Sequence, residues 1–218
     1  MVRHVKGGLF ITLEGGEGGG KSTQSRLLAE ALRHDGLKVR LTREPGGTPG
    51  AEALRQQLLF GKEEFSWKAE ILLHMTARCD HFDQNISPAL EAGEIVICDR
   101  FHDSTWAYQG YGIGHGALER LTFITSLREL LHYEPEATFW LDVSLETAYR
   151  RLAQRGGKLD RYEGLDDAFH RRVREGFEHI YQHDDGKRIQ RIDAEAAPDE
   201  VFTELYESVW ALLRKKGV

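Results

Sequence analysis

Short apolar runs alternate with helix-type hydrophobic patterns along this chain. Runs of apolar, β-branched and aromatic residues predict strands at 9–14, 38–42, 94–98, 137–143 and 189–193. Apolar residues spaced three and four apart predict helices at 21–34, 50–60, 67–92, 116–132, 145–154, 165–183 and 198–214. Strands that alternate with helices favour an α/β fold, with a mostly parallel sheet and helices on both of its faces.

A glycine-rich segment lies between the first predicted strand and the first predicted helix. Its sequence fits G-x-x-x-x-G-K-[ST] in full: Gly15, Gly16, Glu17, Gly18, Gly19, Gly20, Lys21 and Ser22. Glycines let consecutive backbone N–H groups converge on an anion, and the positive end of the following helix faces the same anion. Lys21 would reach the β- and γ-phosphates, and the Ser22 hydroxyl would bind Mg²⁺. The segment therefore predicts a binding site for a nucleoside triphosphate.

Ligands of open parallel sheets bind at the carboxyl ends of the strands, so the residues that follow each strand are informative. The second strand leads into a tight turn at 42–48, which carries Arg43 and Glu44, and Arg55 lies on the next helix within reach of that turn. The third strand ends in Asp99, the position of a Walker B carboxylate that serves Mg²⁺, and Arg100 follows. Arg100 could clamp a second phosphate, although a surface ion pair of Asp99 and Arg100 is an equal alternative.

Two later segments have compositions that suit nucleotide chemistry. Residues 104–112 mix polar, aromatic and glycine residues, which is typical of a loop packed on a base and equally of a buried connecting turn. Residues 155–161 place Arg155 and Arg161 around a pair of glycines. This pattern suits a mobile lid that brings cations onto a transferring phosphoryl group, and also a solvated charged loop.

The composition sets limits on partners and location. The 218 residues suit one α/β domain, 1–218, and the net charge of −6 argues against a broad nucleic-acid surface. The sequence has no run of 18 apolar residues, so no membrane span is expected. The two cysteines, Cys79 and Cys98, form no metal or redox motif and are interpreted as reduced core residues. We expect a cytoplasmic protein whose partners are small molecules.

Four segments together resemble those of the bacterial thymidylate kinases: EGGEGGGKST, TREPGGT, DRFHDSTWAYQG and RGGKLDR. The similarity runs from Leu9 to the C-terminal helix, and the second and third segments are the more specific ones. The resemblance implies a P-loop NTPase fold with a five-stranded parallel sheet and a lid at about 155–163. It also implies transfer of the γ-phosphoryl group of ATP to dTMP with Mg²⁺, as a step of dTTP synthesis, and a homodimer.

The resemblance assigns roles at the phosphate end of the substrate. Arg100 and Arg55 match the arginines that hold the dTMP phosphate, with Arg43 and Glu44 lining the same site. Glu17 matches a carboxylate near the sugar 3′-hydroxyl and the metal region. The glycine loop carries no arginine, so the lid should supply the catalytic cation, and Arg155 and Arg161 are the candidates beside Lys21.

The resemblance also assigns roles at the base. Arg78 matches an arginine that faces thymine, Thr105 and Gln109 match base-edge contacts, and Ser104 belongs to the same substrate-binding segment. Tyr108 matches the aromatic residue that crowds the sugar 2′ position and so favours deoxyribose.

One residue of the base site departs from the family pattern. His74 stands where the family usually places a phenylalanine that stacks on thymine. An imidazole can stack but can also take a proton, which would affect base affinity and pH dependence. A shift of one residue along the helix would bring Met75 to the base instead.

Three other functions fit parts of these motifs. The nearest is another P-loop nucleoside or nucleoside monophosphate kinase. A GTPase switch is a second alternative, but it normally needs an Asn-Lys-x-Asp motif, which this sequence lacks. A catalytically inactive nucleotide-binding protein is the third, and measured phosphoryl transfer would distinguish it.

Overall fold

The computed structural model describes residues 5–156, 160–184, 186 and 188–218. Its sheet contains β1 (Leu9–Glu14), β2 (Val39–Arg43), β3 (Ile95–Asp99), β4 (Ala137–Asp142) and β5 (Ile189–Asp193). The strands are parallel, in the order β2-β3-β1-β4-β5. The predicted five-stranded parallel sheet is confirmed, and the strand ends differ from prediction by no more than one residue.

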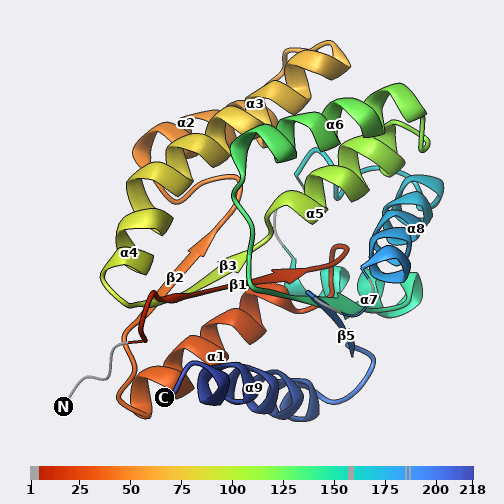
Figure 1. Ribbon diagram of the computed structural model, residues 1–218. Coiled ribbons are helices and arrows are strands. Elements are labelled where there is room, and N and C mark those ends of the chain that lie inside the picture. Colours follow the sequence, from red (N-terminus) through yellow and green to blue (C-terminus); the bar gives the residue numbers. More distant parts are fainter. Residues whose placement is uncertain (1–4, 157–159, 185, 187) are drawn as a thin grey trace.

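Helices cover both faces of the sheet (Figure 1). Helices α1 (Lys21–His34) and α9 (Pro198–Lys215) pack together on one face. The other helices are α2 (Pro49–Phe60), α3 (Trp67–His81), α4 (Ser87–Glu91), α5 (His102–Thr105), α6 (Leu118–Leu131), α7 (Leu145–Arg155) and α8 (Asp167–His183). Across the described part of the chain, we find no helix long and apolar enough to cross a membrane.

The apolar run of β1 is buried on both faces, as expected for a central strand of a parallel sheet. Leu9, Ile11 and Leu13 pack in the core beneath α1 and α9. Phe10, on the opposite face, packs with Phe101 and Val96. This burial fixes the register of β1, and Leu13 pairs with Asp99 of β3. The loop that follows β1 is thereby placed beside Asp99.

The prediction of a helix over 67–92 is confirmed in its extent, but the helix is not one regular α-helix, because the π-helical segment η1 (Phe82–Ile86) connects α3 to α4.

The prediction of a loop over 104–112 is wrong. This stretch is helical, formed by the end of α5 and the π-helix η2 (Trp106–Ile113). The physical reason is close packing against α8, since a Cβ on Gly112 would lie 2.5 Å from the Phe169 ring. The glycines here therefore permit helix contact instead of a turn.

Candidate functional site

The glycine loop between β1 and α1 has a conformation that requires glycine. Gly15 has φ 135° and Gly18 has φ 68°. A Cβ at either position would lie 2.5 Å from a backbone oxygen, that of Leu141 or Ala148. Gly20 precedes α1 in the left-handed region and gives its first turn no side-chain cap. The N–H groups at the start of α1 therefore have no side-chain cap from the described residues, and anion binding by them stays a prediction.

Lys21 and Ser22, the first residues of α1, lie beside the end of β3. The Lys21 ammonium is buried and donates to the Gly16 carbonyl at 2.6 Å. Burial, and then the Arg100 charge, lower the pKa of Lys21. The Ser22 hydroxyl donates to Asp99 Oδ2 at 2.5 Å. A hydroxyl and a carboxylate in contact are hard oxygen donors, which fit Mg²⁺.

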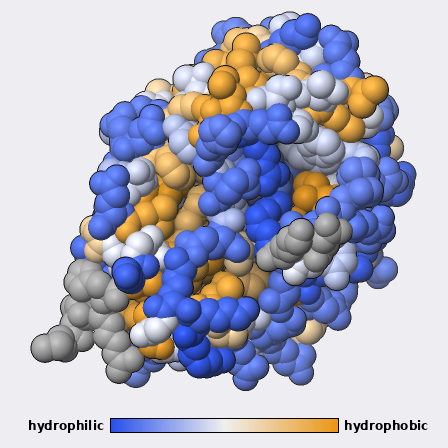
Figure 2. All heavy atoms as spheres, viewed as in Figure 1, coloured by the Kyte–Doolittle hydropathy of each residue, from blue (hydrophilic) through white to orange (hydrophobic). Residues whose placement is uncertain are grey.

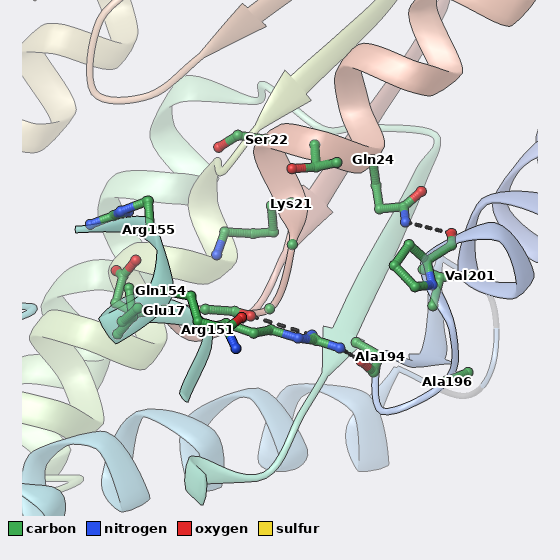
Figure 3. Close-up of a pocket in the computed structure, with 16 residues that line it drawn as sticks. Glu17, Lys21, Ser22, Gln24, Arg151, Gln154, Arg155, Ala194, Ala196 and Val201 are labelled. Carbon is green, nitrogen blue, oxygen red and sulfur yellow. Dashed lines mark hydrogen bonds between the residues drawn. The ribbon is translucent and has the colours of Figure 1, made fainter. Parts of the chain in front are cut away.

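A cavity of about 460 Å³ opens on the glycine loop (Figure 3). Its other walls are the end of α7 and the segment that follows β5. Arg151 joins these walls, since it donates to the Gly18 carbonyl at 3.4 Å and to the Ala194 carbonyl at 2.9 Å. Gln24 donates to the Pro198 carbonyl at 2.8 Å. Sequence reasoning missed Arg151, Gln24 and residues 194–201, although the position of 194–201 after a strand was a usable signal.

A second cavity adjoins the first and shares four lining residues with it: Glu17, Lys21, Ser22 and Arg155. The structure brings most of the predicted substrate residues to its walls: Arg43, Glu44, Arg55, His74, Arg100, Ser104, Thr105, Tyr108 and Gln109. Asp99 lines the second cavity and contacts Ser22, which lines both. Figure 2 shows hydrophilic atoms gathered in a hollow near the middle of this side of the molecule.

Arg100 is the best-connected cation of the second cavity. Its guanidinium donates to Glu17 at 2.6 Å, to the Gly15 carbonyl at 2.8 Å and to the Tyr108 hydroxyl at 2.9 Å. Tyr108 in turn donates to Glu17 at 2.7 Å. Burial opposes ionisation of Glu17, but Arg100 and then Lys21 lower its pKa to about 2. Glu17 is therefore a carboxylate that holds Arg100 in the position of an anion-binding group.

Two further arginines line the same cavity. Arg55 donates to the Pro45 carbonyl at 2.8 Å, and Arg43 pairs with Glu52 at 3.0 Å. Burial, and then the Arg43 charge, lower the pKa of Arg55. Arg43, Arg55 and Arg100 thus place three guanidinium groups on the walls of one cavity, a chemistry that suits a phosphate.

Arg78 is buried behind the cavity wall. Its guanidinium donates to Glu44 at 2.7 Å and to the Thr105 hydroxyl at 3.2 Å. Among the described residues, those that line the second cavity include Glu44 and Thr105 but not Arg78. Contact between Arg78 and a base stays a prediction. What the structure shows is that Arg78 forms hydrogen bonds to Glu44 and Thr105, which line the cavity.

The helix register of α3 directs His74 to the cavity, while Met75 packs in the core with Ile71 and Ile124. Burial first, then Arg78 and Arg161, lower the pKa of His74 to about 3. His74 is therefore neutral at neutral pH, and we expect it to add no pH dependence near neutrality. Tyr162 also lines the cavity, and its hydroxyl contacts His74 Nε2 at 3.1 Å. Sequence reasoning missed Tyr162.

The two lid candidates differ in position. Arg155 ends α7, lines both cavities and pairs with Glu163 at 2.7 Å. Arg161, by contrast, lines neither cavity among the residues that the structure describes, and its backbone N–H donates to the Leu59 carbonyl at 3.2 Å. Residues 157–159, the middle of the predicted lid, lie outside the described residues.

A buried carboxyl group lies beneath the wall that carries Ser104. Glu14 Oε1 accepts from the Phe101 N–H at 2.7 Å, and Oε2 accepts from the Ser104 hydroxyl at 2.5 Å. Burial, and then the nearby Asp103, raise the pKa of Glu14 to about 7. Sequence reasoning missed Glu14, because an acidic residue that ends an apolar strand gives no sign of its partners.

Comparison with known proteins gives concordant results. The family model described as thymidylate kinase matches residues 13–205. A Gluconobacter oxydans protein named thymidylate kinase is 59% identical over 97% of this chain and 98% of its own length. A Rhizorhabdus wittichii protein of the same name is 47% identical over 94% of this chain and 99% of its own length. The crystal structure of an Ehrlichia chaffeensis thymidylate kinase covers 93% of this chain and 98% of its own, with TM-score 0.74 and 37% identity.

Proposed function

This chain belongs to the thymidylate kinase family, and we propose that its first cavity binds ATP and its second binds dTMP. The enzyme phosphorylates dTMP to dTDP. The observation that carries the site assignment is the junction of the two cavities at Glu17, Lys21, Ser22 and Arg155. A donor and an acceptor placed in these cavities would meet at the groups that handle phosphate charge.

The ATP phosphates are assigned to the backbone of Gly15–Ser22. This proposal is supported by the positive φ values of Gly15, Gly18 and Gly20 and by the uncapped start of α1. Lys21 adds a buried positive charge at the inner end of the loop. The remainder of ATP would extend along the wall formed by Arg151 and residues 194–201.

Mg²⁺ is assigned to Ser22 and Asp99. Their hydroxyl and carboxylate oxygens are in contact at 2.5 Å and have the chemistry that Mg²⁺ prefers. When bound, the ion would neutralise charge on the ATP phosphates.

The dTMP phosphate is assigned to Arg100 and Arg55, with Arg43 and Glu44 beside them. Arg100 is supported most strongly, because its side chain is only 16% exposed, already binds a carboxylate and lines the cavity that Ser104 also lines. The incoming phosphate would take over bonds that Arg100 now makes to Glu17. Glu17 would then be free to turn toward the sugar 3′-hydroxyl and the metal region.

The base and sugar are assigned to the other end of the second cavity. His74 offers a neutral ring for stacking, and Thr105 and Gln109 offer polar groups for the base edge. Tyr108 is buried and packs in a core cluster with Tyr162 and Phe169, which suits a group that excludes a 2′-hydroxyl. Arg78 would act on the base either directly or through Thr105, which it contacts at 3.2 Å.

The transfer step needs alignment and charge neutralisation more than covalent chemistry. The acceptor is a phosphate oxygen that is anionic at neutral pH, so the site requires no strong general base. Lys21 and the lid arginines, Arg155 and Arg161, would stabilise the transferred group. We treat 155–163 as a lid within the single domain 1–218, and Arg155, which lines both cavities, supports this assignment.

We propose that the enzyme is a cytoplasmic homodimer whose partners are otherwise small molecules. Leu72 on α3 and Leu118 and Leu130 on α6 are 44%, 79% and 73% exposed. Figure 2 shows apolar atoms gathered at this edge, over α3 and α6. Such an apolar surface suits a self-complementary contact between copies. Light scattering should give twice the chain mass, and the double variant Leu118→Glu, Leu130→Glu should give the mass of the monomer.

The free thiols of Cys79 and Cys98 support the proposed cytoplasmic location, because unpaired cysteines suit a reducing compartment.

A coupled ADP-release assay with ATP and Mg²⁺ tests the proposed sites. The acceptors are dTMP, dUMP, UMP, CMP, AMP and GMP. Strong turnover of dTMP, weaker turnover of dUMP and negligible turnover of the ribonucleotides are expected. A preference for another monophosphate would keep the phosphate assignments and overturn the base site, in favour of a different nucleoside or nucleoside monophosphate kinase.

A further inference from the structure

Beneath the second cavity, a buried hydrogen-bond network joins three separate segments of the chain. Glu70, on α3, is 5% exposed, and its Oε1 accepts from the Tyr162 hydroxyl at 2.9 Å. The same Oε1 accepts from Gln109 Nε2, on η2, at 3.2 Å. Gln109 Nε2 also donates to the Tyr162 hydroxyl at 2.9 Å. No role in catalysis or binding has been assigned above to Glu70 or Tyr162.

The chemistry of the donors and acceptors fixes the direction of each bond. The Glu70 carboxylate only accepts, so the single hydroxyl proton of Tyr162 is used by Glu70. The Tyr162 oxygen then serves as an acceptor for its other two contacts, Gln109 and His74. His74 must therefore carry its proton on Nε2, which agrees with the neutral imidazole that its burial imposes.

The network also fixes which end of the Gln109 amide is available. Both acceptors, Glu70 Oε1 and the Tyr162 oxygen, bind the amino end of the carboxamide. A reversed amide would place its carbonyl oxygen against the Glu70 carboxylate, which is unfavourable. The carbonyl Oε1 is thus the end of Gln109 left for a ligand in the cavity that it lines. An acceptor at this position complements the N3–H donor of a 2,4-dioxopyrimidine, whereas cytosine has an acceptor at N3.

We propose that Glu70 and Tyr162 are positioning residues that set base specificity, by holding Gln109 with its carbonyl toward the base and His74 in one ring orientation. The inference rests on the proposed dTMP site. It adds two residues that do not contact the base edge through their own polar groups, because Glu70 is not among the described residues that line the cavity and the Tyr162 hydroxyl is used within the network. Specificity for thymine over cytosine then originates in a carboxylate behind the cavity wall.

The first test is Tyr162→Phe, which removes only the hydroxyl. The KM for dTMP should rise about tenfold, the loss expected for one buried hydrogen-bonding group, while the KM for ATP stays within twofold. Tyr206→Phe is the matched control. Tyr206 lies on α9, is not among the described residues that line the second cavity, and donates its hydroxyl proton to Asp35 at 2.6 Å. The control should leave both KM values unchanged.

The second test is Glu70→Gln, which keeps the shape but adds a donor. The Gln109 amide could then reverse, so the ratio of kcat/KM for dTMP over dCMP should fall about tenfold or more. In a Gln109→Ala background, Glu70→Gln should leave this ratio nearly unchanged, because the group it orients is gone. A merely structural role would lower the melting temperature without moving the ratio.

The outcomes separate this inference from the proposed function. Wild-type turnover of dTMP is measured first, and its absence would refute the dTMP site itself. If wild-type turnover is normal and both variants keep the wild-type dTMP KM and dTMP/dCMP ratio, only the positioning role is overturned.

Discussion

The two cavities that meet at Lys21 are built in different ways. The wall of the first that contains Lys21 is one continuous segment, residues 17–24, whose shape depends on glycine φ values and on the start of α1. The second collects side chains from β2, α2, α3 and the α5–η2 segment, together with Asp160, Tyr162 and Glu163. Its side chains are oriented by other side chains, such as Arg100 by Glu17 and Gln109 by Glu70. A site that binds its ligand through backbone N–H groups should keep most of its affinity when one side chain is removed. In a site built from side chains that orient one another, removing one side chain should also displace its neighbours.

The sharpest test of this contrast is Lys21→Ala. The backbone N–H groups would remain, so ATP affinity should fall only severalfold. The charge that stabilises the transferring group would be lost, so kcat should fall about 10³-fold. Single-turnover kinetics and ATP calorimetry measure the two quantities separately. A kcat within tenfold of the wild type would contradict the role of Lys21.

Arg100→Ala should be the most damaging change for binding in the second cavity. It removes the proposed phosphate clamp and leaves Glu17 and Tyr108 without their cation. We expect dTMP affinity to fall about 10²-fold, with ATP affinity within severalfold, both measured by calorimetry. Arg191→Ala is a suitable control, since Arg191 pairs with Asp142 outside both cavities. Unchanged dTMP affinity would refute the assignment of Arg100.

Of the two lid candidates, which both belong to the described residues, Arg155 lines both cavities and Arg161 lines neither. Arg155→Ala should lower kcat about 10²-fold and change the dTMP Kd little, as expected for a cation that acts on the transferring group. Arg161→Ala should have the smaller effect on kcat. If both variants keep normal turnover, the lid assignment is wrong, and if Arg161→Ala has the larger effect, the lid must rearrange when substrates bind.

The same contrast explains how much could be predicted from the sequence. The strands, the glycine loop and Asp99 follow from local patterns, and the structure confirms the strands and brings Ser22 into contact with Asp99. The helical form of residues 104–112 could not be predicted locally, since it depends on contact between Gly112 and Phe169 of α8.

Glu14, Glu70 and Tyr162 were missed for a related reason. Each acts through a partner more than 80 residues away in the chain: Phe101 for Glu14, and Tyr162 for Glu70. A hydrogen bond between such distant residues leaves no spacing or periodicity in the sequence. The resemblance to a family predicted most of the side chains that line the second cavity, but it did not predict Glu14, Glu70 or Tyr162.

The role of the buried Glu14 carboxyl group can be tested through the pH dependence of protein stability. The folded protein holds a proton on Glu14 up to about pH 7, whereas the unfolded chain releases it near the ordinary value of 4.5. The free energy of unfolding should therefore fall as pH rises between these values, by up to a few kcal/mol at about 1.36 kcal/mol per pKa unit. Glu14→Gln mimics the protonated acid and should remove this dependence.

Urea unfolding of the wild type and of Glu14→Gln, measured from pH 5 to 7.5, checks the expected change. The stability of the wild type relative to the variant should decrease steadily across this range. Glu94→Gln is the matched control, because Arg40 and Lys38 lower the pKa of the Glu94 carboxyl against the effect of its burial. A lowered pKa places its titration below 4.5, so the difference for Glu94→Gln should stay flat. A flat difference for Glu14→Gln as well would mean that Glu14 is ionised in the folded protein, and that the Ser104 wall is held by a buried charge.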